Sequence, residues 1–372
     1  MLNKNYRNLA INLLLVIGSV FIGFILVELI ARPHNLKFEN FILKDGGDLV
    51  HKFYRKLFRY DPDLGWLPIS NVSVAKWDGQ VTITDDGIRS NGVPSDLDND
   101  ISILALGDSF TFGDEVSDDE TWPSFLEQLT HTKVYNAGVS SYGLDQIILR
   151  LEKERLIKKY HPQVIILSTL ADDIQRCLQT IRHGDPKPYF ILKNNELILQ
   201  KQRAFYGIRF DWFRRIFGYS YVCHKIMGSK FPGYWWSGTS HDFRNIKGNA
   251  LRISELLFDR FMKSAQSKDV IFLVQEWGPQ DLSESLKPQD LLESLIEYIK
   301  YTYPKVHVVY LRPLLLQLQQ TNPQEYESLF FGHMTPKGNK FVAQLLATEI
   351  MKFSDVKSAP TMSTPPSQAL GY

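Results

Sequence analysis

A serine and a distant histidine are the residues of this sequence best suited to covalent chemistry. Ser109 directly follows the apolar run 101–108, which ends in Gly-Asp, and His333 lies in the segment 330–339. A serine hydroxyl is a weak nucleophile until a base takes its proton, and that base must be near in the fold rather than in the sequence. We therefore predict that Ser109 is a nucleophile and that His333 is its base.

The elements that must bring these residues together are predicted from apolar strands that alternate with helices. Such a pattern is typical of a parallel sheet covered on both faces. Ligands bind such sheets at the carboxyl ends of the strands, where Ser109 and His333 both fall. The predicted fold class is α/β, a three-layer sandwich with a five-stranded parallel sheet. Strands are expected at 101–108, 133–139, 164–170, 270–277 and 306–311, and helices at 117–129, 144–160, 250–266, 291–303 and 338–353.

The N-terminal residues predict a membrane anchor. Residues 9–27 form one apolar stretch, and at a rise of about 1.5 Å per residue a helix of this length matches the bilayer core. Lys4 and Arg7 precede it, which favours a cytoplasmic N-terminus. A cleaved signal peptide is the alternative, but the run is long for one and no A-x-A-like site follows it. We expect a single-pass protein of the cell membrane with an extracytoplasmic domain.

The rest of the chain divides by composition and pattern. An insertion interrupts the strand–helix alternation; it starts with a hairpin over 189–199 and continues in an aromatic-rich run. Insertions at strand ends often cover a site, although this one could also form a small satellite core. The expected parts are an N-terminal membrane anchor (1–31), a connecting segment (32–99), an α/β domain (100–355) with the insertion 183–249, and a disordered tail (356–372).

Charge and composition exclude several classes of partner and cofactor. The net charge of +1 gives no basic field for nucleic acid. Zinc-ligand spacing is impossible with Cys177 and Cys223 alone, and the sequence has neither a P-loop nor a G-x-G-x-x-G motif. We expect no metal and no cofactor. The two cysteines could form a disulfide outside the cytoplasm or remain free.

Four segments, in order, resemble the blocks of the SGNH/GDSL hydrolase family, in its membrane-anchored bacterial type. They are GDSFTFG (107–113), YNAGVSSYGLDQ (135–146), LADDIQR (170–176) and GHMTPKGN (332–339). The resemblance covers residues 100–177 and about 266–350, and it implies an SGNH/flavodoxin-like sheet. It also implies that Ser109 is the nucleophile and His333 the base. The implied oxyanion hole consists of the backbone N–H of Ser109, Gly138 and, at the position of the family's asparagine, Asp172.

Two departures from the family pattern concern the site. The third block usually reads Asn-Asp, whereas Asp172-Asp173 stand here, and an ionised carboxylate cannot donate to an oxyanion. The last block usually has an aspartate two or three residues before the histidine, where this chain has phenylalanines. His333 therefore lacks the expected orienting acid. The sequence offers three glutamates that could take the place of this acid: Glu276, Glu325 and Glu327.

The resemblance implies an extracytoplasmic serine esterase acting on an acyl or acetyl ester, with an envelope glycan as one candidate substrate. A close variant is an O-acyltransferase on polysaccharide, which would pass the same acyl group to a sugar hydroxyl instead of water. The second class is a non-catalytic carbohydrate-binding protein with a degenerate SGNH fold. Both departures favour that class, and the aromatic residues of the insertion, including Trp212, Trp235 and Trp236, could stack on sugar rings.

Overall fold

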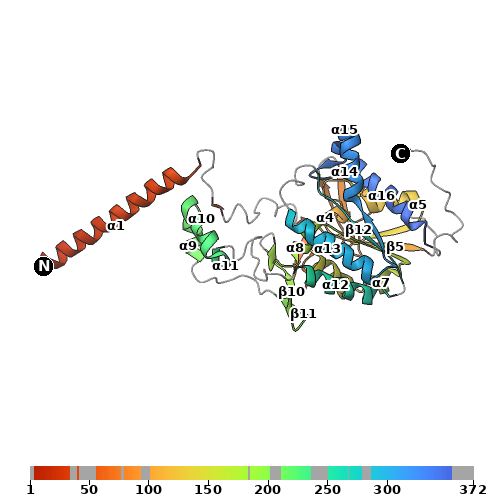
Figure 1. Ribbon diagram of the computed structural model, residues 1–372, viewed down its shortest axis with the longest axis horizontal. Coiled ribbons are helices and arrows are strands. Elements are labelled where there is room, and N and C mark those ends of the chain that lie inside the picture. The colour runs from red at the N-terminus through yellow and green to blue at the C-terminus, as the bar shows by residue number, and fades with distance from the viewer. Residues whose placement is uncertain are drawn as a thin grey trace. The chain divides into compact units, whose positions relative to one another are not determined.

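The structure is a computed structural model of the 372-residue chain (Figure 1). It describes residues 4–33, 40–41, 56–76, 79–93, 101–182, 185–201, 211–235, 250–266, 268–278 and 286–353. The predicted tail 356–372 and Trp236 lie outside these described residues. The chain divides into two compact units. The larger comprises Lys52–Thr180, Lys187–Gln202 and Arg244–Tyr372, and the smaller Met1–His51, Ile181–Pro186 and Arg203–Phe243.

A five-stranded sheet forms the centre of the larger unit. Its strand order is β13-β12-β7-β5-β6, and every neighbouring pair is parallel. All six residues of β7 are buried, as expected for a strand covered on both faces. The predicted fold class is confirmed. The strands are β5 Ser102–Leu106, β6 Lys133–Asn136, β7 Val164–Thr169, β12 Asp269–Val274 and β13 His307–Tyr310.

Helices cover both faces of the sheet and complete the three layers (Figure 1). On one face α5 Trp122–Thr130, α14 Leu311–Thr321 and α16 Pro336–Ile350 share one apolar core with the strands. On the other face Phe258 of α12 packs edge-to-face on Phe272 of β12, with ring centroids 5.4 Å apart. The helices of this second layer are α6 Leu144–Lys153, α12 Ala250–Ala265 and α13 Leu286–Thr302.

Two predicted helices differ in detail from the structure. The helix expected over 144–160 is broken into α6 and α7 Leu156–Tyr160, because Arg155 adopts a left-handed backbone with φ 51°, which ends helical hydrogen bonding. The helix expected over 117–129 begins as a 3₁₀ turn, η1 Asp118–Glu120, before α5 starts. Neither break moves the strands that position the site.

The connecting segment packs against the α/β unit from residue 56 onward. It forms two hairpins, and Trp66 at the first donates from its indole Nε1 to the carbonyl of Ser140 at 3.0 Å. Arg89 after the second is buried and donates from Nε to Asp118 Oδ1 at 2.8 Å. The hairpins are β1 Phe58–Asp61 with β2 Gly65–Pro68, and β3 Val72–Lys76 with β4 Gly79–Ile83.

The predicted hairpin of the insertion is present as β10 Pro188–Lys193 and β11 Glu196–Lys201. Its turn residues Asn194 and Asn195 have φ 52° and 62°, the positive values that a two-residue type I′ turn requires. The hairpin contacts α6 and α12, so it lies on a helical layer.

The smaller unit contains the N-terminal helix α1 Lys4–Ala31. Its segment Ile11–Ala31 has a mean hydropathy of 2.8, is not buried by the described chain, and is long and apolar enough to cross a membrane. Three short helices, α9 Asp211–Phe217, α10 Tyr221–Lys230 and α11 Pro232–Trp235, belong to the same unit. Trp235 is buried there, and its Nε1 donates to His224 Nδ1 at 3.2 Å. The unit also holds the short pair β8 Ile181–Arg182 and β9 Asp185–Pro186.

Candidate active site

Ser109 is presented by a tight turn at the carboxyl end of β5. It is the first residue of the short helix α4 Ser109–Phe112, whose N-cap Asp108 accepts from the Phe110 N–H at 3.0 Å. A Cβ on Gly107 would lie 2.1 Å from Thr111 Oγ1, so only glycine allows the strand to pass this close to the helix. The turn leaves the buried Ser109 hydroxyl at the edge of the sheet where ligands bind.

His333 is held by a small hairpin between α15 Pro323–Ser328 and α16. The hairpin pairs β14 Phe330–Phe331 with β15 His333–Met334 around Gly332, which has φ 77°. That conformation favours glycine. Helix α16 then starts at the N-cap Thr335, whose side chain accepts from the Gly338 N–H. The hairpin and the cap fix the backbone on both sides of His333.

The two predicted residues meet in the fold. His333 Nε2 lies 3.0 Å from Ser109 Oγ, although they are 224 positions apart in the chain. This is the distance at which an imidazole can accept the proton of a serine hydroxyl. Phe110 and Trp277 pack on the imidazole, with ring centroids 5.0 and 5.1 Å away. They limit the rotation of the ring.

A third residue, Glu115, completes the constellation, and the sequence did not indicate it. Glu115 Oε1 lies 3.3 Å from His333 Nδ1, and Oε2 accepts from the His333 backbone N–H at 3.0 Å. A carboxylate at Nδ1 favours the tautomer with a free Nε2 lone pair and stabilises the imidazolium. Glu115 is therefore placed where an orienting acid would have to lie.

The position of Glu115 depends on two unusual backbone conformations. Glu115 itself has φ 73°, an uncommon value for a non-glycine residue. A Cβ on Gly332 would lie 2.9 Å from Glu115 Oε2, so glycine beside the histidine leaves room for the carboxylate. Gly332 belongs to the histidine block, but the acid itself comes from the loop after α4, outside every block.

The acids considered from the sequence have other partners or lie elsewhere. Glu276 pairs with Arg312 at 2.8 Å. Glu325 pairs with Lys337 at 2.6 Å. Glu327 is exposed on α15. Glu115, rather than any of these three, is the carboxylate that lies within 3.3 Å of His333 Nδ1.

The electrostatic surroundings change the basicity of His333. Burial alone disfavours the imidazolium, but the nearby Glu115 carboxylate and the negative charges of Asp114 and Asp108 outweigh it and raise the pKa of His333 above its usual value. A raised pKa makes the imidazole a stronger base. It also means that the ring is protonated, and unable to accept from Ser109, over a wider range of acidic pH.

A buried ionic cluster supports the turn beneath Ser109. Arg176, the last residue of α8 Ala171–Arg176, donates from Nη1 to Asp108 Oδ2 at 3.0 Å and to Asp173 Oδ1 at 2.6 Å. All three side chains are buried. Burial and the neighbouring Asp108 raise the pKa of Asp173, while Arg176 opposes that rise. The cluster links α8 to the N-cap of α4.

Asp172 borders this cluster at the surface. Its side chain is 40% exposed and lies 3.9 Å from Arg176 Nη2. Its Oδ2 accepts from the indole Nε1 of Trp277 at 3.2 Å, and Trp277 in turn packs on His333. The carboxylate therefore lies next to residues that surround the dyad, with a cation and an indole N–H beside it.

Gly138 packs against the backbone of α4 and does not contact the side chains of Ser109 and His333 in the hydrogen bonds described. Its N–H donates to Asn136 Oδ1 at 3.1 Å, and a Cβ there would lie 2.3 Å from the backbone N of Phe112. Gly138 thus packs closely against the backbone of α4, with its N–H already engaged. Its role in an oxyanion hole stays a prediction.

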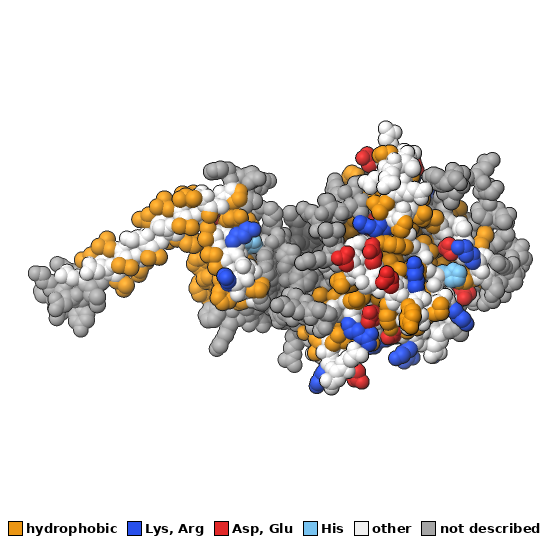
Figure 2. All heavy atoms as spheres, viewed as in Figure 1, with side chains coloured by type: hydrophobic (Ala, Val, Ile, Leu, Met, Phe, Trp, Pro, Cys, Tyr) orange, Lys and Arg blue, Asp and Glu red, His pale blue; other side chains and the backbone are white. Residues whose placement is uncertain are grey.

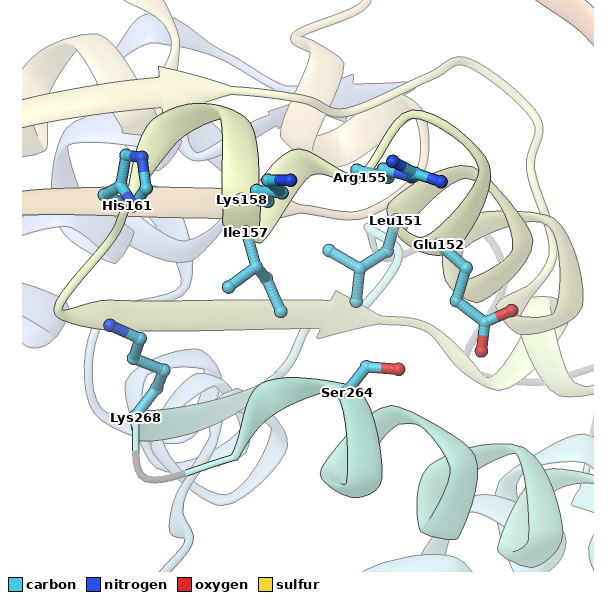
Figure 3. A pocket seen from close by; sticks show the side chains of 8 residues that line it. All are labelled: Leu151, Glu152, Arg155, Ile157, Lys158, His161, Ser264 and Lys268. Atoms are coloured by element: carbon cyan, nitrogen blue, oxygen red, sulfur yellow. The ribbon is translucent and has the colours of Figure 1, made fainter.

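Neither cysteine is paired, and a hollow in the larger unit lies apart from the dyad. Cys177 and Cys223 are free thiols. A hollow of about 400 Å³ lies between the junction of α6 and α7 and the residues just before β12 (Figure 3). Its lining includes His161 and Lys268, which precede β7 and β12. The hollow is therefore at the amino ends of the strands, at the opposite edge of the sheet from Ser109.

No family model matches the chain, and no curated protein matches it in sequence. Several solved structures align with it, and they include lipolytic proteins and esterases. A member of the lipolytic G-D-S-L family from Veillonella parvula DSM 2008 is 14% identical with a TM-score of 0.39, covering 68% of this chain and 98% of its own. A lipase/acylhydrolase from Enterococcus faecalis is 14% identical with a TM-score of 0.42, covering 71% and 100%. The acetyl xylan esterase AlAXEase is 13% identical with a TM-score of 0.39, covering 67% and 100%.

With TM-scores below 0.5, these alignments add nothing to the case made by the chain's own residues. A shared fold does not fix a function, because function depends on the chemistry of a particular site. The function is therefore argued from the geometry of Ser109, His333 and Glu115.

Proposed function

We propose that this protein is a membrane-anchored, SGNH-type serine hydrolase that cleaves ester bonds. The observation that carries the proposal is the 3.0 Å contact between Ser109 Oγ and His333 Nε2, with Glu115 on the far side of the imidazole. A nucleophile, its base and an orienting acid in this order are the recurrent arrangement of acyl-transferring serine enzymes.

The proposed reaction proceeds through an acyl-enzyme. Ser109 Oγ attacks the ester carbonyl carbon while its proton passes to His333 Nε2. The tetrahedral intermediate collapses when the C–O bond to the alcohol breaks, and the imidazolium gives its proton to the departing alcohol. His333 takes a proton from water as the water oxygen attacks the acyl carbon. The bond from that carbon to Ser109 Oγ then breaks, the imidazolium returns its proton to Oγ, and the acid is released. Glu115 stabilises the imidazolium formed in both steps.

The three-residue geometry favours catalysis over a binding role. The sequence has no aspartate before His333, and this departure from the family pattern favours a non-catalytic protein. Glu115 weakens that objection, because its carboxylate lies 3.3 Å from His333 Nδ1. A sugar-binding surface would not require a serine and a histidine at hydrogen-bonding distance. The O-acyltransferase variant uses the same acyl-enzyme and differs only in its acceptor.

The proposal also assigns a membrane anchor and a class of substrate. The apolar helix segment Ile11–Ala31 would hold the enzyme at the membrane, with the catalytic unit outside the cytoplasm. We propose an acyl or acetyl ester as the substrate because the chemistry of the dyad acts on the ester group. An envelope glycan as the carrier of that ester stays a prediction.

The test is hydrolysis of short p-nitrophenyl esters by the detergent-solubilised full chain. Ser109→Ala and His333→Ala should each lower kcat by about 10³-fold or more, because nucleophile and base act as a unit. His307→Ala is the matched control, since His307 lies on β13 beside Glu349 and should leave kcat unchanged. Wild-type turnover by Ser109→Ala would overturn the assignment of the nucleophile.

A further inference from the structure

Helices α9 to α11 expose large apolar side chains that the described chain does not cover. None of the residues of α10 is buried. Figure 2 shows hydrophobic side chains over these helices. Exposed apolar groups gathered in one place mark an interaction surface. The exposed fractions are 57% for Trp212, 60% for Ile216, 38% for Tyr219, 53% for Ile226 and 58% for Phe231.

These helices are fastened to the carboxyl end of α1. Glu28, in the last turn of α1, accepts from the backbone N–H groups of Tyr221 and Val222 at 2.7 and 3.0 Å. It also accepts from the Ser220 hydroxyl at 2.8 Å, so its carboxylate caps the N-terminus of α10. Arg32 adds a hydrogen bond to the carbonyl of Tyr219 at 3.2 Å. The exposed apolar surface therefore begins where the candidate membrane span ends.

The composition of this surface matches the border between lipid and water. Residues 211–235 contain eight aromatic and four basic residues, and Asp211 is their only acidic residue. Tryptophan and tyrosine are enriched at the headgroup level of membranes, and lysine and arginine interact there with lipid phosphates. Lys225 and Lys230 are both exposed on α10. A surface for a soluble protein partner would not need this excess of positive charge next to a span.

We propose that residues 211–235 form an interfacial platform, which lies in the lipid headgroup layer of the same bilayer that α1 crosses. The exposed apolar side chains enter the acyl boundary, and the exposed Lys225 and Lys230 contact lipid phosphates. Because Glu28 and Arg32 join the platform to α1, the platform fixes the depth at which the chain leaves the membrane. This inference rests on the proposed anchoring by α1.

Tryptophan quenching by brominated lipids tests the platform directly. The full chain is reconstituted into vesicles of phosphatidylcholine and phosphatidylglycerol, brominated either near the headgroup end of the acyl chain or near its middle. Helix α1 contains no tryptophan, so the anchor does not contribute to the signal. Trp212→Phe isolates the exposed indole, and Trp235→Phe is the matched control because Trp235 is buried in the same unit.

The expected result is that Trp212→Phe loses most of the quenching by shallow bromine, while Trp235→Phe keeps it. Flotation of the vesicles separates this inference from the anchor. If the chain floats with the vesicles but Trp212 is not quenched, the platform is wrong and the anchor stands. The exposed surface would then be covered by a partner protein. Protein that does not float would overturn the anchor, and the platform with it.

Discussion

At the scale of single residues, Glu115 is the described carboxylate nearest to the imidazole of His333. It lies 3.3 Å from Nδ1 and contributes to the raised pKa of the imidazole. Glu115→Gln should therefore lower kcat by roughly 10² to 10⁴-fold, because the amide cannot stabilise the imidazolium and favours the wrong tautomer. Glu196→Gln, at the exposed first residue of β11, is the control and should leave kcat unchanged.

The same substitution has a predicted effect on the pH profile. His333 must be neutral to accept the Ser109 proton, so activity falls as pH drops through the pKa of His333. Removal of one neighbouring negative charge lowers that pKa. The acid limb of kcat/KM should move to lower pH in Glu115→Gln, as measured over a pH series. An acid limb that stays in place would show that Glu115 does not act on the imidazole.

Asp172 is the residue at which a substitution is predicted to improve the enzyme. Its partly exposed carboxylate lies beside Trp277 and Arg176 at the border of the site, where negative charge opposes an oxyanion. Asp172→Asn keeps the acceptor oxygen for Trp277 and adds a neutral donor, so kcat should rise, by up to about 10²-fold for one oxyanion donor. An unchanged kcat in p-nitrophenyl ester assays would place Asp172 outside the oxyanion hole.

At the scale of elements, the contact between α8 and the N-cap of α4 supports the turn that carries Ser109. Arg176→Met would leave Asp108 and Asp173 buried without their cation. Breaking a buried ion pair in this way typically costs about 3 to 5 kcal/mol, and that loss should appear in the free energy of unfolding measured by urea denaturation. Arg260→Met is the control, since its partly exposed pair with Glu152 should contribute about 1 kcal/mol or less.

The sequence predicted the strands that carry the Ser109–His333 pair, but it did not predict the loop with Glu115 or helix α10. All five strands were located because buried parallel strands are continuous apolar runs. Glu115 was missed because its loop has a left-handed backbone and no periodicity. Helix α10 was missed for a related reason: it buries no residue, so its sequence has no apolar stripe facing a core.

At the scale of the whole molecule, the central prediction concerns topology. The apolar span, with Lys4 and Arg7 before it, should leave the catalytic unit outside the cytoplasm. Protease added to intact spheroplasts of a bacterial expression host should digest that unit, while a cytoplasmic marker protein stays whole. Full protection of the unit until the membrane is lysed would contradict the predicted orientation.

Covalent labelling of Ser109 is the measurement that tests the proposed chemistry most directly. A fluorophosphonate reacts with a serine only where a base activates it, so peptide mass spectrometry of the labelled full chain should place the phosphonate on Ser109. Ser109→Ala should take up no label, and His333→Ala should take up far less than wild type. Folded wild-type protein that stays unlabelled, or that is labelled at another serine, would contradict the proposal that Ser109 and His333 form a catalytic pair.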